Sequence, residues 1–225
     1  MIPIKDGIRP RTFPFVNLLL ILANIAVYGL QWLSGPYQEE LVYTFALIPA
    51  EFTGGFSPSG VMDIFTSMFM HGSLLHIGGN MLYLWIFGDN VEDSMGHLKY
   101  LIFYLIGGVG AAMAHIFFNP NSVVPTVGAS GAIAAVLGAY LVLYPRSRVL
   151  TLIPLGIYFR FTTVPAIIVL GLWFVLQLFN GMIDLGGPDA GGVAFWAHIG
   201  GFVVGMVLAK VFAKQTQGVL EPEWN

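Results

Sequence analysis

The chain has 225 residues, of which 56% are hydrophobic and only 9% are charged, and it contains 28 glycines and no cysteine. This composition is typical of a polytopic membrane protein, and the absence of cysteine excludes disulfide bonds and thiol chemistry. The net charge of −3 gives no indication of nucleic-acid binding. At this length we expect one compact bundle rather than several domains.

Apolar runs predict six membrane-spanning helices, at residues 15–33, 71–87, 98–118, 130–144, 164–183 and 195–212. An even number of spans places both termini on one side of the membrane. All 9 lysines and arginines fall in the tails or loops assigned to that side, namely Lys5, Arg9, Arg11, Lys99, Arg146, Arg148, Arg160, Lys210 and Lys214. By the positive-inside rule, both termini are therefore cytoplasmic. The first run is long enough to be a retained span rather than a cleaved signal.

The first loop on the opposite side, residues 34–70, is the longest stretch between predicted spans. It combines an apolar part, 41–52, with a turn cluster at 54–60 that is rich in glycine and serine. Long loops inside compact proteins are usually folded or functional. We therefore expect a structured loop that lies partly in the outer leaflet, with a simple linker as the alternative.

The second predicted span carries two polar side chains at membrane depth. His76 and Asn80 lie four residues apart, so on a helix they share one face. This spacing lets an imidazole and a carboxamide point at the same site. A polar pair in apolar surroundings needs a partner there.

The fourth predicted span is too short to cross a bilayer. From Ser130 to Tyr144 a helix extends about 21 Å, whereas the hydrocarbon core is roughly 30 Å thick. Residues 119–127, directly before it, contain two prolines and cannot form a regular helix. Ser130 should therefore start its helix inside the membrane, after irregular backbone that neighbouring protein or water must shield.

The last predicted span carries His198 beside a face of small residues, Ala197, Gly201 and Gly205, which allows close helix packing. Counted from the cytoplasmic ends of their spans, His76 and His198 lie at depths of about 20 Å and about 18 Å. Both depths match that of Ser130. Three groups capable of chemistry, from three different spans, should thus meet at one level.

These groups have complementary chemistry. Serine is a poor nucleophile until a base takes its proton, and neutral His198 is the candidate base. Unpaired amides at the start of the fourth helix can stabilise an oxyanion together with the side chains of His76 and Asn80. No carboxylate occurs at this depth, so we predict a Ser130–His198 dyad whose histidine is oriented by packing or by another hydrogen bond.

Each of these residues also has a structural interpretation. Ser130 lies among small residues, which commonly serve helix packing in membranes. His198 could be an interhelical hydrogen-bond partner, and two histidines with an asparagine could line the path of a transporter. The joint occurrence of all four side chains at matched depth favours a catalytic site.

Several motifs occur together in this chain. They are Gly128-Ala-Ser130-Gly131, His76-x-x-x-Asn80, Gly88-x-x-x-Glu92-x-x-x-Gly96 and Ala197-His198-x-x-Gly201-x-x-x-Gly205. The first resembles the Gly-x-Ser-Gly motif of the rhomboid intramembrane serine proteases. The others are similar to that family's second-helix oxyanion pair, to its structural turn after the second helix, and to its sixth-helix motif that carries the base.

The resemblance extends from about residue 15 to residue 214 and implies the basic rhomboid fold. The fold that it implies is that of an all-α membrane protein, a six-transmembrane-helix bundle. Its fourth helix is short and starts inside the membrane, and its first outer loop is structured. Residues 1–225 would form a single rhomboid-type membrane domain with short cytoplasmic tails at both ends. We expect a multi-pass protein of a prokaryotic plasma membrane.

The resemblance also implies roles for particular residues. The catalytic pair would be Ser130 and His198. Oxyanion stabilisation would come from His76, Asn80, Gly128 and the Ser130 backbone. Helix packing would involve Gly131, Gly201 and Gly205, and structural roles would fall to His71 and Glu92. In this chain Ala134 stands where many members place an aromatic ring against the catalytic histidine.

The implied activity is that of a serine endopeptidase without metal or other cofactor. Its substrates would be membrane proteins with a helix-destabilised transmembrane segment, cleaved in or next to that segment within the lipid bilayer, and nucleic acid would play no part. Two alternatives remain, a rhomboid-like protein that binds membrane clients without cutting them and a small transporter. Transporters commonly show internal repeats and paired broken helices, and this sequence has no repeat and one shortened span.

The fifth predicted span has no residue assigned to the chemistry. It precedes a glycine-rich loop, 186–192, whose missing side chains leave it free to move. We expect this span and loop to form a lateral gate. Lipid-facing Trp173, Phe174 and Phe179 would close it, with ordinary packing as the alternative.

Overall fold

The computed structural model describes residues 1–53, 58–156, 158–185 and 192–214. These residues are mostly helical. The helices are α1 (Phe15–Leu33), α2 (Gln38–Phe45), α3 (Pro49–Thr53), α4 (Pro58–Thr66), α5 (Leu74–Met95), α6 (His97–Phe118), α7 (Ser130–Leu143), α8 (Ala166–Asp184) and α9 (Phe195–Phe212), with a 3-10 turn at Gly35–Tyr37. The strands are β1 (Ile2–Asp6), β2 (Arg148–Leu155) and β3 (Tyr158–Pro165).

Among the described residues, 4 helices are long and apolar enough to cross a membrane, namely α1, α6, α8 and α9. The predicted first and last spans have the same bounds as α1 and α9, and the third differs from α6 by one residue. The chain is therefore an integral membrane protein. Crossings by α5 and by the short α7 are still predictions.

The predicted second span was wrong at both ends. Helix α5 begins at Leu74, where the Ser73 hydroxyl accepts a hydrogen bond from the His76 amide, and it continues through several acidic residues to Met95. The resemblance placed a structural turn after the second helix here, at Gly88 to Gly96. In the structure Glu92 is fully buried, and its carboxylate accepts hydrogen bonds from the backbone amides of Val16 and Asn17 at the start of α1. The charge is thus used to cap a neighbouring helix.

Two glycines of the α5 motif allow this arrangement. A Cβ atom on Gly88 would overlap the side chains of Asn17 and Tyr100, which are hydrogen-bonded to each other. Gly96 has a φ of +85° and carries the chain from α5 directly into α6. Such a φ is readily available only to glycine. The motif therefore joins α1, α5 and α6, and the structural role of Glu92 is still a prediction.

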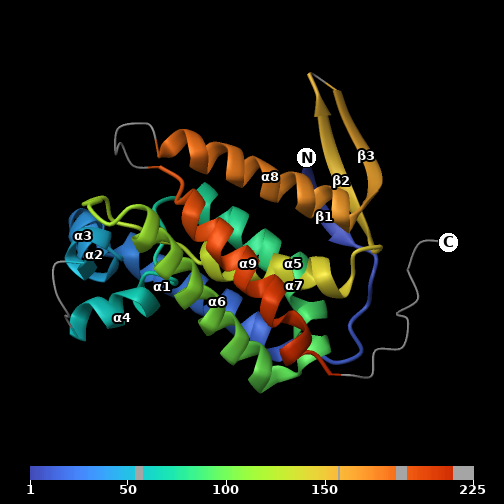
Figure 1. The fold of residues 1–225 in the computed structure, drawn as a ribbon, viewed down its shortest axis with the longest axis horizontal. Helices are drawn as coiled ribbons and strands as arrows, with labels where there is room; N and C mark the ends of the chain where they lie inside the picture. The colour runs from blue at the N-terminus through green and yellow to red at the C-terminus, as the bar shows by residue number, and fades with distance from the viewer. Residues whose placement is uncertain (54–57, 157, 186–191, 215–225) are drawn as a thin grey trace.

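The short helix α7 lies at the centre of the bundle, between α5, α6 and α9 (Figure 1). Every residue from Gly131 to Tyr140 is buried. The backbones of α7 and α9 touch, because a Cβ on Gly201 or Gly205 would overlap a carbonyl oxygen of α7. The small-residue face of α9 therefore lies against α7, and this contact holds the beginnings of the two helices side by side.

The three-stranded antiparallel sheet was missed by the sequence analysis. Strands β2 and β3 form a hairpin that projects past the N-terminal end of α8, crosswise to the helices (Figure 1). Strand β1 pairs with β2, with Ile2 opposite Leu152. Because β3 continues to Pro165, the predicted start of the fifth span at Val164 was wrong and α8 begins at Ala166. The last two residues of β3, Val164 and Pro165, were counted with the apolar run of α8, and the rest of the hairpin was taken as a loop.

The described part of the loop 34–70 is folded into α2, α3 and α4. It is joined to the segment before α7 by an antiparallel bridge between Leu47 and Thr126. The loop therefore supports the irregular backbone that leads to Ser130, which a simple linker would not do. Residues 54–57 of its turn cluster lie outside the described residues.

Both ends of the described chain lie at the same end of the bundle, around the C-terminal part of α5. The Asp6 carboxylate accepts hydrogen bonds from Asn90 at 2.7 Å and from the Tyr140 hydroxyl at 2.6 Å. The Lys214 amide donates to the Ser94 carbonyl oxygen. This arrangement agrees with the prediction that the two termini share one side of the membrane.

Candidate functional site

Ser130 is the first residue of α7, and the segment that precedes it is irregular backbone. Gly128, two residues earlier, has a φ of +130° and donates its amide to the Ser67 carbonyl oxygen at 2.8 Å. Ser130 itself is partly exposed to a cavity. Amides in the first turn of a helix have no partner within it, so the start of α7 combines a hydroxyl with free donors.

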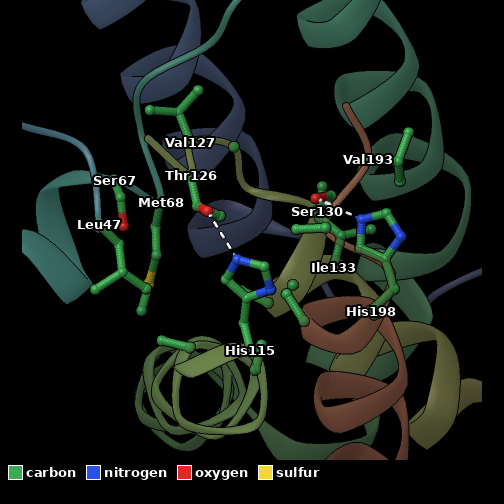
Figure 2. A pocket seen from close by; sticks show the side chains of 18 of the residues that line it. Leu47, Ser67, Met68, His115, Thr126, Val127, Ser130, Ile133, Val193 and His198 are labelled. Carbon is green, nitrogen blue, oxygen red and sulfur yellow. Dashed lines mark hydrogen bonds between the residues drawn. The ribbon is translucent and has the colours of Figure 1, made fainter. Parts of the chain in front are cut away.

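His198 meets Ser130 from the second turn of α9. Its Nε2 atom lies 2.8 Å from Ser130 Oγ, and the side chain is 9% exposed. Figure 2 shows the two side chains pointing toward each other at the wall of the cavity. The close approach of α7 and α9 at Gly131 and Gly201 makes this distance possible. Two residues that are 68 positions apart in the chain thus form one hydrogen-bonded pair.

The other ring nitrogen of His198 is also hydrogen-bonded. Its Nδ1 atom lies 2.9 Å from Oε1 of Gln177 on α8. The ring of Trp173, one turn earlier on α8, lies with its centroid 5.7 Å from that of the histidine. The span to which the sequence analysis assigned no residue of the chemistry thus supplies a hydrogen-bond partner of His198. The sequence signal was Gln177 itself, a polar residue in an otherwise apolar run.

Trp173 and Phe174, which the gate hypothesis places against lipid, are partly buried. Trp173 packs against His198 and Phe202, and Phe174 stacks on Phe202 with ring centroids 4.6 Å apart. Phe179, by contrast, is 57% exposed. Ala134 is fully buried and has no aromatic ring. The aromatic contact to His198 comes instead from Trp173 on α8. The glycine-rich loop proposed for the gate lies outside the described residues at 186–191.

Asn80 is held by a chain of hydrogen bonds that leads away from the cavity. Its Nδ2 atom lies 2.9 Å from His71 Nε2, and His71 Nδ1 lies 3.3 Å from the Phe69 carbonyl oxygen. Since a carbonyl only accepts, the proton of His71 is on Nδ1 and its Nε2 accepts from Asn80. Gln31 completes the chain by bonding both the amide and the carbonyl of His71. The structural role of His71 is still a prediction.

His76 lies beside Gly128 and faces the same space as Asn80. A Cβ atom built on Gly128 would stand 2.7 Å from His76 Nε2 and 3.6 Å from Asn80 Nδ2. These two side chains therefore converge on the backbone that precedes Ser130. The Gly128 amide is different, because it donates to Ser67 and is not available to an oxyanion. The expectation for the Gly128 amide was wrong for this reason.

One cavity of about 660 Å³ connects these groups. Ser130, His198, His76 and Asn80 line one part of it. A second polar pair faces the cavity, because Thr126 Oγ1 lies 2.9 Å from Nε2 of His115, as Figure 2 shows. Much of the remaining wall is apolar, for example Leu47, Met68, Val127, Ile133 and Val193. The cavity can thus hold an extended, largely apolar segment against the hydroxyl of Ser130.

Across residues 1–53, 58–156, 158–185 and 192–214, no group of three or more His, Asp or Glu side chains could hold a metal ion. What the arrangement can do is proton transfer from a hydroxyl to an imidazole beside hydrogen-bond donors. This is the chemistry of acyl transfer to serine.

Comparison with known proteins gives a consistent family assignment. A family model described as "Rhomboid domain" matches residues 58–215. The chain is 25% identical over 216 residues to "Rhomboid protein 1, mitochondrial" of Saccharomyces cerevisiae, covering 90% of this chain and 56% of that protein. It is 32% identical over 155 residues to "Rhomboid protease GluP" of Bacillus subtilis, covering 69% of this chain and 27% of that protein.

A further relative is "Rhomboid-like protein 11, chloroplastic" of Arabidopsis thaliana, 26% identical over 218 residues, covering 93% of this chain and 70% of that protein. The chain thus spans about half the length of the yeast relative and about a quarter of the Bacillus one. These relatives include a mitochondrial, a chloroplastic and a bacterial protein. These comparisons do not support the expectation of a prokaryotic plasma membrane.

Proposed function

The chain belongs to the rhomboid family, and on that premise we propose that it is an intramembrane serine endopeptidase. The observation that carries the proposal is the hydrogen bond of 2.8 Å between Ser130 Oγ and His198 Nε2. This bond lies at the start of a buried helix, in a cavity within a membrane-spanning bundle. A serine paired with a histidine base is the arrangement that activates a hydroxyl for attack on a carbonyl.

The reaction begins with attack on the scissile peptide bond. Ser130 Oγ forms a bond to the carbonyl carbon while its proton moves to His198 Nε2. The tetrahedral oxyanion is stabilised by the Ser130 amide at the N-terminus of α7 and by the side chains of His76 and Asn80. The C–N bond then breaks, and the imidazolium gives its proton to the leaving amine.

The same groups then hydrolyse the acyl-enzyme, with water in the place of the leaving amine. Water donates a proton to neutral His198 and attacks the ester carbonyl, and the Ser130 oxygen leaves with that proton. No other reactant is required. The water reaches Ser130 through the polar part of the cavity, which His76, Asn80, His115 and Thr126 line.

The proposed substrates are membrane proteins whose transmembrane segment is easily unwound. A peptide bond in a regular helix is hydrogen-bonded and shielded by side chains, so a local break in the helix is needed before the carbonyl can reach Ser130. The bilayer is part of the reaction system, because substrate enters from lipid. In this proposal α5 and α7 complete a set of six crossings.

Labelling with a fluorophosphonate tests the function directly. The purified protein in detergent is treated with the probe, and the modified residue is mapped by mass spectrometry. Modification of Ser130 in the wild type, and none in His198→Ala, is expected. Absence of labelling, together with no cleavage of a model transmembrane substrate in liposomes, would favour a client-binding protein without protease activity.

A further inference from the structure

Gln177 extends the hydrogen-bonded pair into a chain of three side chains from three helices. Ser130 is on α7, His198 on α9 and Gln177 on α8. The two bonds of the imidazole measure 2.8 Å to Ser130 Oγ and 2.9 Å to Gln177 Oε1. Within the described residues, no Asp or Glu side chain is hydrogen-bonded to His198.

The position of Gln177 on its helix is unusual for a polar side chain. Its neighbours Val175 and Leu176 are 57% and 49% exposed on the outer face of α8, whereas Gln177 is partly buried and turned toward α9. A carboxamide turned into an apolar bundle loses its hydration, and this loss must be offset by a hydrogen bond. His198 Nδ1 supplies that bond.

The atom that faces the histidine determines the proton's position. Oε1 of Gln177 can only accept, so the hydrogen of a neutral imidazole is held on Nδ1. Nε2 is then left with its lone pair toward Ser130, which is the form that acts as a base. The opposite tautomer would direct an N–H at the serine oxygen and could not take its proton.

We infer that Gln177 is a positioning residue that holds His198 in the tautomer and orientation required to deprotonate Ser130. This inference rests on the proposed protease function. Gln177 does not touch the reacting atoms and takes up no proton, since a carboxamide is not basic. Its carbonyl dipole also remains directed at Nδ1–H when the imidazolium forms, and so stabilises the transient positive charge.

Trp173 contributes to the same task from the same face of α8. It precedes Gln177 by four residues, so the two side chains project from one side of the helix. The indole ring limits the tilt of the imidazole, while the amide fixes its rotation. Together they take the place of the aromatic contact that Ala134 cannot provide.

The first experiment compares reaction rates. Gln177→Leu removes the acceptor at similar volume, Gln177→Glu keeps an acceptor, and Asn180→Leu removes a carboxamide one turn further along α8 as a matched control. The rate of Ser130 labelling by a fluorophosphonate should fall about tenfold or more in Gln177→Leu, as expected for loss of an orienting hydrogen bond. Gln177→Glu should retain a rate well above that of Gln177→Leu, and Asn180→Leu should match the wild type.

Steady-state cleavage of a model substrate provides a second readout. In Gln177→Leu the loss should appear in kcat with KM unchanged, because the substrate contacts are not altered. A loss of folding in Gln177→Leu would instead lower the fraction of that variant labelled at saturating probe, whereas a slower reaction of folded protein leaves this fraction unchanged. A raised KM with normal kcat would overturn the inference.

The third readout does not depend on activity. In protein labelled with 15N-histidine, the nitrogen chemical shifts distinguish the two neutral tautomers, and the signal of His198 is assigned by its loss in His198→Ala. The wild type should carry the proton on Nδ1, and Gln177→Leu should show a mixture of tautomers. If the wild type is labelled at Ser130 but Gln177→Leu has the same rate and the same tautomer, the inference fails and the proposed function stands. If the wild type is not labelled at all, the proposed function fails first.

Discussion

Asn80 donates a hydrogen bond of 2.9 Å to Nε2 of His71, a residue that does not reach the serine. The bond uses one of the two N–H groups of the carboxamide. It thereby fixes the orientation of the carboxamide plane, which also contains the second N–H group. Asn80 Nδ2 also lies 3.6 Å from the place that a Cβ atom on Gly128 would occupy, so the carboxamide is close to the backbone that precedes Ser130. Since hydrogen bonds to an oxyanion strengthen in the transition state, this orientation should affect kcat more than KM.

The first prediction concerns this pair. His71→Ala and Asn80→Ala should each lower kcat roughly tenfold, which is less than the loss of about 10² to 10³ seen for removal of a single oxyanion donor elsewhere, because the Ser130 amide shares the charge. The double variant should be no slower than either single one, since the two residues act as one unit. Steady-state kinetics on a model transmembrane substrate provides the measurement. If the losses in kcat add in the double variant, the two residues act independently and the prediction is wrong.

The second prediction concerns the nucleophile and the base. Ser130→Ala and His198→Ala should each abolish turnover while leaving the fold intact, because Ser130 is small and lies among small residues. The double variant should be as inactive as the single ones, as for residues that act together. Cleavage assays and circular dichroism measure the two properties. Retention of more than a few per cent of wild-type turnover by Ser130→Ala would contradict the role of the serine.

The third prediction separates the two faces of α8. Phe179 is 57% exposed, so Phe179→Val should ease lateral entry and speed cleavage of a transmembrane substrate without changing hydrolysis of a short soluble peptide. Trp173 contacts the His198 ring, so Trp173→Val should slow both reactions. Parallel assays in liposomes with the two substrates distinguish these effects. If Phe179→Val changes both reactions equally, entry does not occur along this side of α8.

The fourth prediction concerns the buried carboxylate of Glu92. It accepts hydrogen bonds from two amides at the start of α1 and contacts His97 from α6. Glu92→Ala leaves both amides unpaired, which should lower the free energy of unfolding by about 2 to 4 kcal/mol. Thermal unfolding in detergent measures the change. Exposed Glu39, in the first turn of α2, provides the control, because Glu39→Ala should have little effect.

The fifth prediction concerns pH and the anchoring of the N-terminal strand. Burial raises the pKa of the Asp6 carboxyl from 3.8 to about 6, although the Tyr140 hydroxyl opposes the shift. The folded chain therefore binds more protons than the unfolded chain between these pH values, and stability should fall as pH rises from about 4 to about 6. The change corresponds to roughly 3 kcal/mol at most.

The variant Asp6→Asn checks this assignment, because an amide oxygen can still accept from Asn90 and Tyr140 but does not titrate. Its melting temperature should vary less than that of the wild type across this pH range and should be higher at neutral pH. An unchanged pH dependence in the variant would assign the effect to other groups.

Much of the site could be predicted from the sequence, because depth in a membrane is nearly a linear function of position along a helix. Counting residues from the charged ends placed His76, Ser130 and His198 at one level, and the structure brings Ser130 and His198 into hydrogen-bond contact. The shortness of the fourth span and its preceding prolines indicated where the nucleophile's helix begins. These are local properties of the chain.

Charge and strand patterning were less informative. The motif from Gly88 to Gly96 was expected to be a turn after the second helix, since a sequence does not reveal that Glu92 lies within α5 and caps the start of another helix. The hairpin of β2 and β3 lies almost entirely in the loop between the fourth and fifth predicted spans and was not recognised, because short apolar runs give no clear strand signal. In both cases the deciding contact comes from residues far away in the chain.

The sequence by itself determined the apolar spans, the depth of the reactive side chains and the small residues that allow α7 and α9 to touch. Only the tertiary structure decided which side of each helix faces its neighbours. It turned Gln177 and Trp173 toward His198, left Phe179 outside, and used the Gly128 amide to hold Ser67. The physical reason is that an apolar helix in a bilayer has little amphipathic pattern, so its rotation is fixed by packing and by a few buried hydrogen bonds.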